Sequence, residues 1–290
     1  MVRCHGAQQG TARVRYGRHV ASNLACIGLD VDSRDEFDEL VGALLPDAVS
    51  LGRSGRTEVL RWQDPSGARL VFEVHAGAVE GVLPSYDALA GATIADLAMV
   101  DDDVAIGWLT DGREPGTQIA LEVEERRLVL TKRGGVDGPL SIVGLGVGAE
   151  LFEDADAFAA APASLVHGDT EHIPEPSPHV VEFNLPWPPR MTAESVLSYG
   201  VYAEPHDIDA YARVNGTVLG ASTRTVERTG QSFHAVRVRT AGFDMEMCIP
   251  ASVHPDLPRT GQVIAGMAFM VGSLGASIAR PKRLHMPRRA

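Results

Sequence analysis

Cysteine is scarce in this sequence and widely spaced. Cys4, Cys26 and Cys248 are the three cysteines among 290 residues, and no two of them form a CxxC pair. An odd number of distant cysteines argues against a disulfide framework. We therefore predict a reduced, cytoplasmic setting for the protein.

Long apolar runs and an excess of basic charge are also missing. No apolar run approaches the length that crosses a bilayer, and residues 1–20 lack the apolar centre of a secretory signal. The chain has 38 acidic against 26 basic residues, which gives a formal net charge of −12 at pH 7. This balance disfavours broad binding to nucleic acid, and we expect no membrane partner.

Familiar catalytic motifs are absent as well. The sequence contains no G-x-S-x-G elbow, no P-loop and no H-E-x-x-H pair. Gly144, Gly146 and Ala149 match the glycine pattern of a dinucleotide loop, but the proline-rich residues 171–179 follow where that fold needs a second parallel strand. We expect a glycine-rich strand at this place, with no dinucleotide and no other cofactor.

Glycine and proline are abundant, with 30 and 18 residues, and sustained helical periodicity is rare. This composition predicts a β-rich α+β fold, with βαβββ-type module(s) followed by a small β-barrel-like domain. The predicted divisions are a basic arm (1–22), an α+β domain (23–185), a proline-rich linker (186–197), an OB-like β domain (198–278) and a basic tail (279–290). We expect the basic arm and the basic tail to be disordered or loosely docked ends, with docking on an acidic partner or surface as the alternative.

Residues 23–74 carry the clearest local pattern. Residues 24–31 alternate between two faces, which predicts a strand. Ser33 followed by Glu36 forms a capping box, and the apolar residues after it recur at helical spacing. Two strands, at 58–62 and 68–74, are then predicted on either side of an Asp-Pro-Ser-Gly turn.

This order of a strand, a helix and two strands joined by the turn at 64–67 resembles one module of the vicinal oxygen chelate superfamily, which includes glyoxalases and bleomycin-resistance proteins. Members bind a divalent metal through a His on the first strand and a Glu on the last. Those positions fall here on Cys26 and Val71, with Glu73 one alternation further along. A thiol opposite a valine does not suit such metals. The resemblance therefore implies a metal-free scaffold whose ligand-binding face carries Cys26, Asp30, Val71 and Glu73.

The C-terminal part is a second region of extended runs separated by polar turns, at 208–271. This pattern is similar to a small closed barrel of OB type. Such barrels often bind single-stranded nucleic acid through aromatic and basic side chains. Here the exposed faces mix arginines with acids and hold few aromatics, so nucleic acid is disfavoured as a partner.

A connector in mid-chain holds the densest group of imidazoles and carboxylates. Its members are His167, Asp169, Glu171, His172 and His179. These side chains are candidates for a metal or base cluster. Their spacing matches neither a helix face nor a strand face, and the prolines between them are typical of a surface connector, so we expect no bound metal.

Taken together, these features predict a non-catalytic binding or assembly protein with a small molecule or a protein as its partner. The alternative is an enzyme of the vicinal oxygen chelate superfamily that is metal-independent or unusually liganded. It would use Glu73 or a histidine of residues 166–179 as its base. A homo-oligomer is also open, because single modules of this scaffold usually need a second to complete the sheet.

Overall fold

In the computed structural model, the described residues are 22–110, 115–130, 135–146, 148–166, 173, 175–204 and 206–275. Almost all of the predicted basic arm and the whole predicted basic tail lie outside them. Within the described ranges, none of the helices combines the length and the apolar character that a membrane crossing requires.

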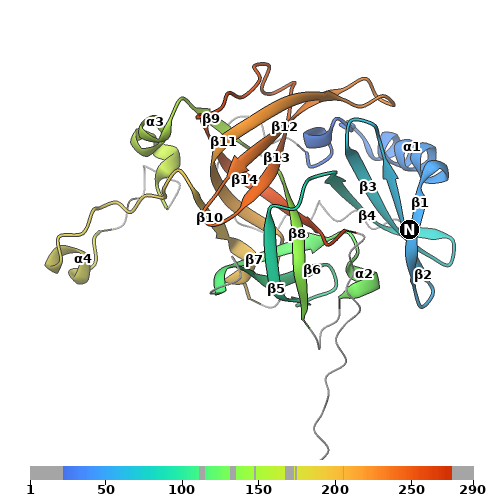
Figure 1. Ribbon diagram of the computed structural model, residues 1–290, viewed down its shortest axis with the longest axis horizontal. Helices are drawn as coiled ribbons and strands as arrows, with labels where there is room; N and C mark the ends of the chain where they lie inside the picture. Colours follow the sequence, from blue (N-terminus) through green and yellow to red (C-terminus); the bar gives the residue numbers. More distant parts are fainter. Residues whose placement is uncertain are drawn as a thin grey trace, which may run out of the picture.

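Two β-sheets dominate the described chain, which confirms the predicted β-rich fold (Figure 1). The smaller sheet is antiparallel and has four strands in sequence order: β1 (Val49–Ser54), β2 (Thr57–Gln63), β3 (Ala68–His75) and β4 (Ala78–Tyr86). The turn between β2 and β3 closes where Gly67 N–H donates to Asp64 O at 2.9 Å. The strands β2 and β3 and the turn between them were predicted from the sequence, whereas no strand was predicted at β1 or β4.

The larger sheet closes on itself as a barrel of eight strands, in the order β11, β12, β13, β8, β5, β6, β7, β14. These are β5 (Ala92–Met99), β6 (Val104–Thr110), β7 (Pro115–Val123), β8 (Val136–Leu145), β11 (Tyr211–Thr225), β12 (Ser232–Arg239), β13 (Asp244–Pro250) and β14 (Val263–Ser273). A further pairing joins β8 to β14. Short strands β9 (Glu150–Phe152) and β10 (Ser195–Ser198) extend the sheet from β14 and β11.

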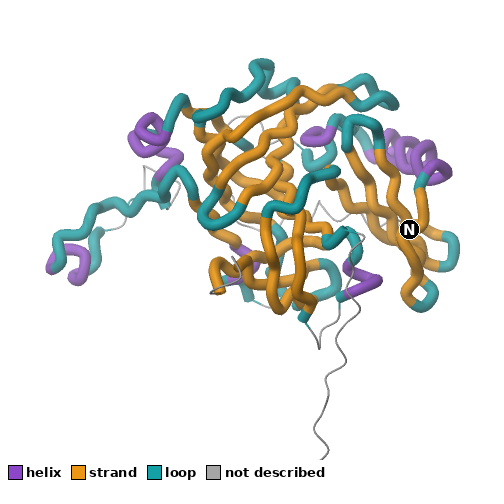
Figure 2. The backbone as a smooth tube through the Cα atoms, in the orientation of Figure 1, coloured by secondary structure: helices purple, strands orange, loops and turns teal. Residues whose placement is uncertain are grey.

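Alternation along the barrel strands separates two hydrophobic cores. On β12, Val236 and Val238 point into the barrel core, whereas Phe233 and Ala235 belong to the core outside it. The outer core lies between the barrel wall and the small sheet, which stand side by side in Figure 2. The outer wall of the barrel is thus the surface on which the N-terminal part packs.

The predicted capped helix is confirmed as α1 (Arg34–Leu44). The Ser33 hydroxyl accepts from Glu36 N–H at 3.2 Å, and the Glu36 carboxylate accepts from Asp32 N–H at 2.9 Å. Both side chains of the capping box therefore accept a backbone hydrogen bond. Glu36 accepts from Asp32 N–H, one residue before the N-cap Ser33 that usually donates in this motif. Val41 and Leu44 are buried on the apolar face, and η2 (Leu45–Asp47) follows.

The predicted first strand at Leu24–Val31 is wrong. The segment forms a 3₁₀ turn, η1 (Ala25–Ile27), which ends at Gly28 in a left-handed conformation with φ of 72°. A Cβ at this position would lie 2.9 Å from Val226 Cγ2, so only glycine fits. The alternation failed as a signal because the residues on both sides of the turn are buried.

Two further features differ from the sequence-based predictions. No helix was predicted directly after residue 123, but Arg126–Val129 forms the short helix α2 after β7. A separate barrel was expected at 198–278, but the observed barrel also takes β5 to β8 from before the predicted linker at 186–197. Strand alternation shows that a segment is extended and does not show which distant strand pairs with it.

Residues 175–189 carry the small helix α4 (Pro178–Glu182) away from the two sheets (Figure 1). At the base of this segment, Leu165 pairs with Arg190 beside α3 (Ala155–Ala160) and η3 (Pro162–Ser164). Near its tip, Val181, Phe183 and Leu185 are exposed. We call residues 175–189 the arm; it is a different segment from the predicted basic arm at 1–22. A last 3₁₀ turn, η4 (Tyr199–Val201), follows β10.

Candidate functional site

Cys26 and Asp30, two of the predicted ligand-binding residues, lie at the join between η1 and the barrel. Cys26 is fully buried in the outer core, and burial raises the pKa of its thiol to about 12. The Asp30 backbone is clamped by Gln231, which accepts from Asp30 N–H at 2.7 Å and donates to Asp30 O at 3.0 Å. A pKa this high keeps the Cys26 thiol protonated near neutral pH, and only the thiolate is nucleophilic, so Cys26 is a structural residue here.

Val71 and Glu73, the other two, lie on β3. Val71 is buried in the outer core, between Arg61 and Leu83 in the strand register. Both oxygens of Glu73 accept from guanidinium groups: Oε1 from Arg126 at 2.7 Å and Oε2 from Arg127 at 3.0 Å. Cys26 and Glu73 therefore have different partners, and neither lines the two pockets described below.

The predicted histidine and carboxylate cluster falls mostly outside the described residues. His167, Asp169, Glu171 and His172 lie there, whereas His179 belongs to α4, with its ring 4.6 Å from that of Phe183. Among the residues that the structure does describe, no group of three His, Cys, Asp or Glu side chains is arranged to hold a metal ion.

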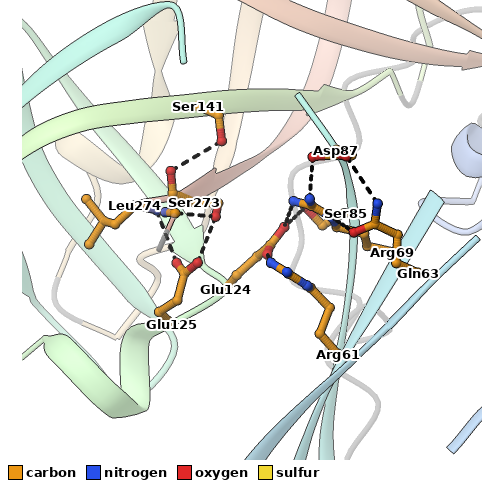
Figure 3. Close-up of polar contacts among 11 residues, drawn as sticks. Arg61, Gln63, Arg69, Ser85, Asp87, Glu124, Glu125, Ser141, Ser273 and Leu274 are labelled. Carbon is orange, nitrogen blue, oxygen red and sulfur yellow. Dashed lines mark hydrogen bonds and ion pairs between the residues drawn. The ribbon is translucent and has the colours of Figure 1, made fainter. Parts of the chain in front are cut away.

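The small sheet is joined to the barrel through a buried carboxylate that sequence analysis missed (Figure 3). Glu124 follows β7 and its side chain is 0% exposed. It accepts from Ser85 Oγ at 2.6 Å and pairs with Arg61 at 3.3 Å and Arg69 at 3.4 Å. These three partners come from three strands of the small sheet, so one carboxylate of the barrel ties that sheet down.

A second buried network surrounds Arg126 at the start of α2. Its guanidinium contacts Glu122 at 2.5 Å, Glu73 at 2.7 Å and Asp103 at 3.0 Å. Burial alone would lower the pKa of Arg126, but these carboxylates raise it above its ordinary value. The arginine is thus firmly charged and acts as a second clamp between the sheet and the barrel.

Glu125 lies between Glu124 and Arg126 in the sequence, and its environment is less favourable for a charge. Its carboxylate accepts from Ser273 Oγ at 2.7 Å and from Leu274 N–H at 3.1 Å (Figure 3). No ion pair with a cation is recorded for it in the described part of the chain. Burial, with the neighbouring charge of Glu124, raises the pKa of Glu125 above its ordinary value.

A pocket of about 340 Å³ opens where the end of β4 meets the outer wall of the barrel. Its lining residues come from the end of β4, from the segment that follows it, and from β11, β12 and β13: Tyr86, Asp87, Leu89, Gly220, Ala221, Ser222, Arg224, Ala235, Arg237 and Glu246. The barrel side contributes small residues, and charged side chains flank them. A pocket of this volume is in the range that holds small molecules.

Charged groups of both signs line this pocket, which we call the β4–barrel pocket. Arg237 Nη1 is 3.5 Å from Glu246 Oε1, and Arg224 lies beside the Tyr86 hydroxyl. Asp87 is held from the other side by Arg69 and Gln63, which connects the pocket to the Glu124 network (Figure 3).

No protein-family model matches the chain, and comparisons with curated proteins and with solved structures found no match. The resemblance to the vicinal oxygen chelate superfamily therefore stays a prediction from the sequence. The residues of the β4–barrel pocket and the charges around it are the features from which a function can be inferred.

A second pocket, of about 320 Å³, also lies where the small sheet meets the barrel. It is lined by Leu44, Asp47, Trp62, Gln63, Asp64, Pro65, Glu227 and Arg228. Asp64 already accepts from Ser66 N–H and Glu227 N–H, so its carboxylate is used in holding the turn and the neighbouring hairpin. The Asp64 carboxylate thus serves the fold, and we take the β4–barrel pocket as the candidate site.

The raised pKa of Glu125 predicts how stability responds to pH when this group is made neutral. Folding favours the protonated form, so its stabilising contribution is present below the ordinary pKa of 4.5 and is lost as pH rises through the folded value. We expect Glu125→Gln to gain stability relative to the native protein as pH increases from about 4 to about 8. Urea midpoints at several pH values measure this.

The matched control is Glu80→Gln, the same change at an exposed position of β4. If Glu125→Gln follows Glu80→Gln across the whole pH range, burial does not disfavour the Glu125 charge and the prediction is wrong. A loss of stability that deepens with rising pH would contradict it more strongly, since the carboxylate would then be the favoured form.

Proposed function

We propose that this chain is a non-catalytic binding protein that holds a small molecule in the β4–barrel pocket. The observation that carries the proposal is the pocket itself: about 340 Å³, with small side chains and a glycine on the barrel side and two arginines at its margin. Gly220, Ala221, Ser222 and Ala235 leave the space that larger residues would fill. Charged residues around such a space orient a ligand and give specificity.

Chemical reactivity receives less support from the same residues. The Cys26 thiol has a pKa of about 12, and both Glu73 oxygens accept from arginines. A general base needs a free lone pair directed at the proton it removes. The enzyme alternative, with Glu73 as its base, would therefore require Arg126 and Arg127 to move first, whereas binding in the β4–barrel pocket needs no rearrangement.

Filling the pocket tests the proposal. Ser222 faces Ala235 in the strand register, so Ser222→Trp places an indole in the space. Ligand-observed NMR with a mixture of amino acids, carboxylic acids and sugar phosphates is expected to give a signal with the native protein that Ser222→Trp removes. The control is Leu219→Trp, an exposed position on the same strand outside the lining.

Circular dichroism and thermal melts of both variants show whether each retains the fold. Signals that survive in a folded Ser222→Trp protein would place binding elsewhere, and a mixture without any Ser222→Trp-sensitive signal would contradict a small-molecule function at this pocket.

A further inference from the structure

Glu246 is a half-buried carboxylate of the β4–barrel pocket that lacks close partners. Its side chain is 14% exposed, and among the described residues its one hydrogen-bond and ion-pair partner is Arg237, whose Nη1 lies 3.5 Å from Oε1. A carboxylate offers two oxygens that together accept several hydrogen bonds. Burial raises the pKa of Glu246, and the charges of Arg237 and Arg224 offset this only in part. The group is thus desolvated without full compensation, which favours a donor from the pocket.

Arg237 is held in place but is bonded only weakly. Its guanidinium reaches Leu89 O at 3.4 Å, Asp244 at 3.4 Å and Glu246 at 3.5 Å. Charge-assisted bonds are normally about 2.7–2.9 Å long. A Cβ on Gly91 would lie 2.7 Å from Arg237 Nη2, so glycine leaves the space for the guanidinium. The Arg237 N–H donors therefore lie at the pocket and form only long hydrogen bonds within the protein, so a ligand can form shorter ones with them.

Arg224 supplies a second cation from β11, the strand paired with β12. It lies beside the Tyr86 hydroxyl, and in the described part of the chain it forms no ion pair with a carboxylate. Two guanidinium groups thus face one pocket with donors to spare. Planar guanidinium groups bind carboxylates in a two-bond geometry, which makes a carboxylate the matching ligand group.

Asp87, the other carboxylate of the lining, is already occupied. Arg69 donates to one of its oxygens and Gln63 to the other. Glu246 is therefore the acidic group of the pocket with room for a cationic donor, next to Arg237.

We propose that the ligand of the β4–barrel pocket is an α-amino acid or a compound with the same head group, whose carboxylate binds Arg237 and Arg224 and whose ammonium group binds Glu246. This inference rests on the proposed function. Because Arg237 and Glu246 contact each other, the two ligand charges must also be close together, as on one Cα atom. A pocket of about 340 Å³ leaves space for a side chain beyond the head group.

Ligands with one charge fit the pocket less well. A simple carboxylate satisfies the arginines but leaves Glu246 desolvated and facing a second negative charge. A simple amine satisfies Glu246 but faces two guanidinium groups. Only a ligand with both charges meets both signs of the lining, and complementary charge arrangement is what sets specificity.

The test compares three probes of nearly one shape by NMR titration of the full chain. Leucine carries both charges, 4-methylpentanoate lacks the ammonium group, and 3-methylbutylamine lacks the carboxylate. We expect leucine to bind about tenfold or more tightly than either single-charge probe, since each removed charge forfeits a charge-assisted contact. Ser222→Trp abolishes leucine binding, and Leu219→Trp does not.

Two charge variants then assign the contacts. Glu246→Gln weakens leucine about tenfold and leaves 4-methylpentanoate unchanged or tighter, whereas Arg224→Met weakens both. Glu80→Gln and Arg56→Met, which change exposed charges outside the pocket, have no effect.

Equal binding of leucine and 4-methylpentanoate, with no effect of Glu246→Gln, overturns the amino-acid assignment. If another compound then binds in a Ser222→Trp-sensitive manner, the proposed function stands without this inference. If no probe and no compound binds in that manner, both fail.

Discussion

Replacing Glu124 by glutamine destabilises the folded protein by about 3–5 kcal/mol. The carboxylate is fully buried and compensates Arg61 and Arg69, of which Arg69 is itself nearly buried. Glutamine has almost the same shape, but it cannot neutralise two guanidinium groups and it turns an amide toward one of them. Breaking a buried pair in this way leaves an uncompensated charge in a low-dielectric environment.

Urea denaturation measures the effect as a lower midpoint. The control is Asp38→Asn, which removes a carboxylate from the exposed Arg34–Asp38 pair of α1. Such a pair contributes about 0.5 kcal/mol or less. If Glu124→Gln costs no more than Asp38→Asn, Glu124 does not hold the small sheet on the barrel. Since that sheet and the barrel meet at Glu124, we also expect the sheet to become the first part to open.

The elements predicted correctly from sequence are those whose signal is local. The capping box of α1 and the Asp-Pro-Ser-Gly turn each satisfy their own backbone groups within a few residues, as at Gly67 and Glu36. The alternation of segment 24–31 is also a local signal, but it predicted the wrong structure. The segment turns at Gly28, where Val226 and Phe233 fill the space that a side chain would need. The residues packed against this turn are thus about two hundred positions away in the sequence, and a pattern read from a few consecutive residues does not include them.

The Glu124–Glu125–Arg126 run shows the same limit for charges. Three consecutive charged residues predict a solvated turn, because such side chains are rarely buried without partners. Here the partners are on other elements: Arg61 and Arg69 on the small sheet for Glu124, and Ser273 for Glu125. One local feature is that Glu122 and Glu124 are two residues apart and so share one face of an extended chain. A solvent-exposed strand would show the same spacing, so this feature does not predict burial.

The β4–barrel pocket was not predictable as a unit. Its lining is taken from four separate segments, and closure of the barrel brings them together. The mixture of arginines and acids on the C-terminal strands is visible in the sequence, where it disfavours nucleic acid as a partner. The same mixture is the basis for the amino-acid ligand, once Arg237 and Glu246 are known to pair across β12 and β13.

Replacing Arg213 by methionine is expected to release the base of the arm. Arg213 on β11 is 2% exposed, and its guanidinium donates to the carbonyl oxygens of Leu165 at 2.6 Å, Val166 at 3.3 Å and also Ala163. Methionine fills much of the volume but donates nothing, so the buried carbonyl of Leu165 and the part-buried carbonyls of Ala163 and Val166 lose their donor. Because each unsatisfied buried group costs about 1–3 kcal/mol, the total loss is about 3 kcal/mol or more.

Limited proteolysis separates this local effect from global unfolding, because cleavage at the base of the arm tracks local opening. We expect Arg213→Met to be cut there faster than the native protein at urea concentrations well below its midpoint. The matched comparison is Arg190→Met, since Arg190 donates to Ala159 O and Ala161 O from an exposed position and its loss exposes those carbonyls to water. Equal stability and equal cleavage of the two variants would show that the buried guanidinium does not fix the arm.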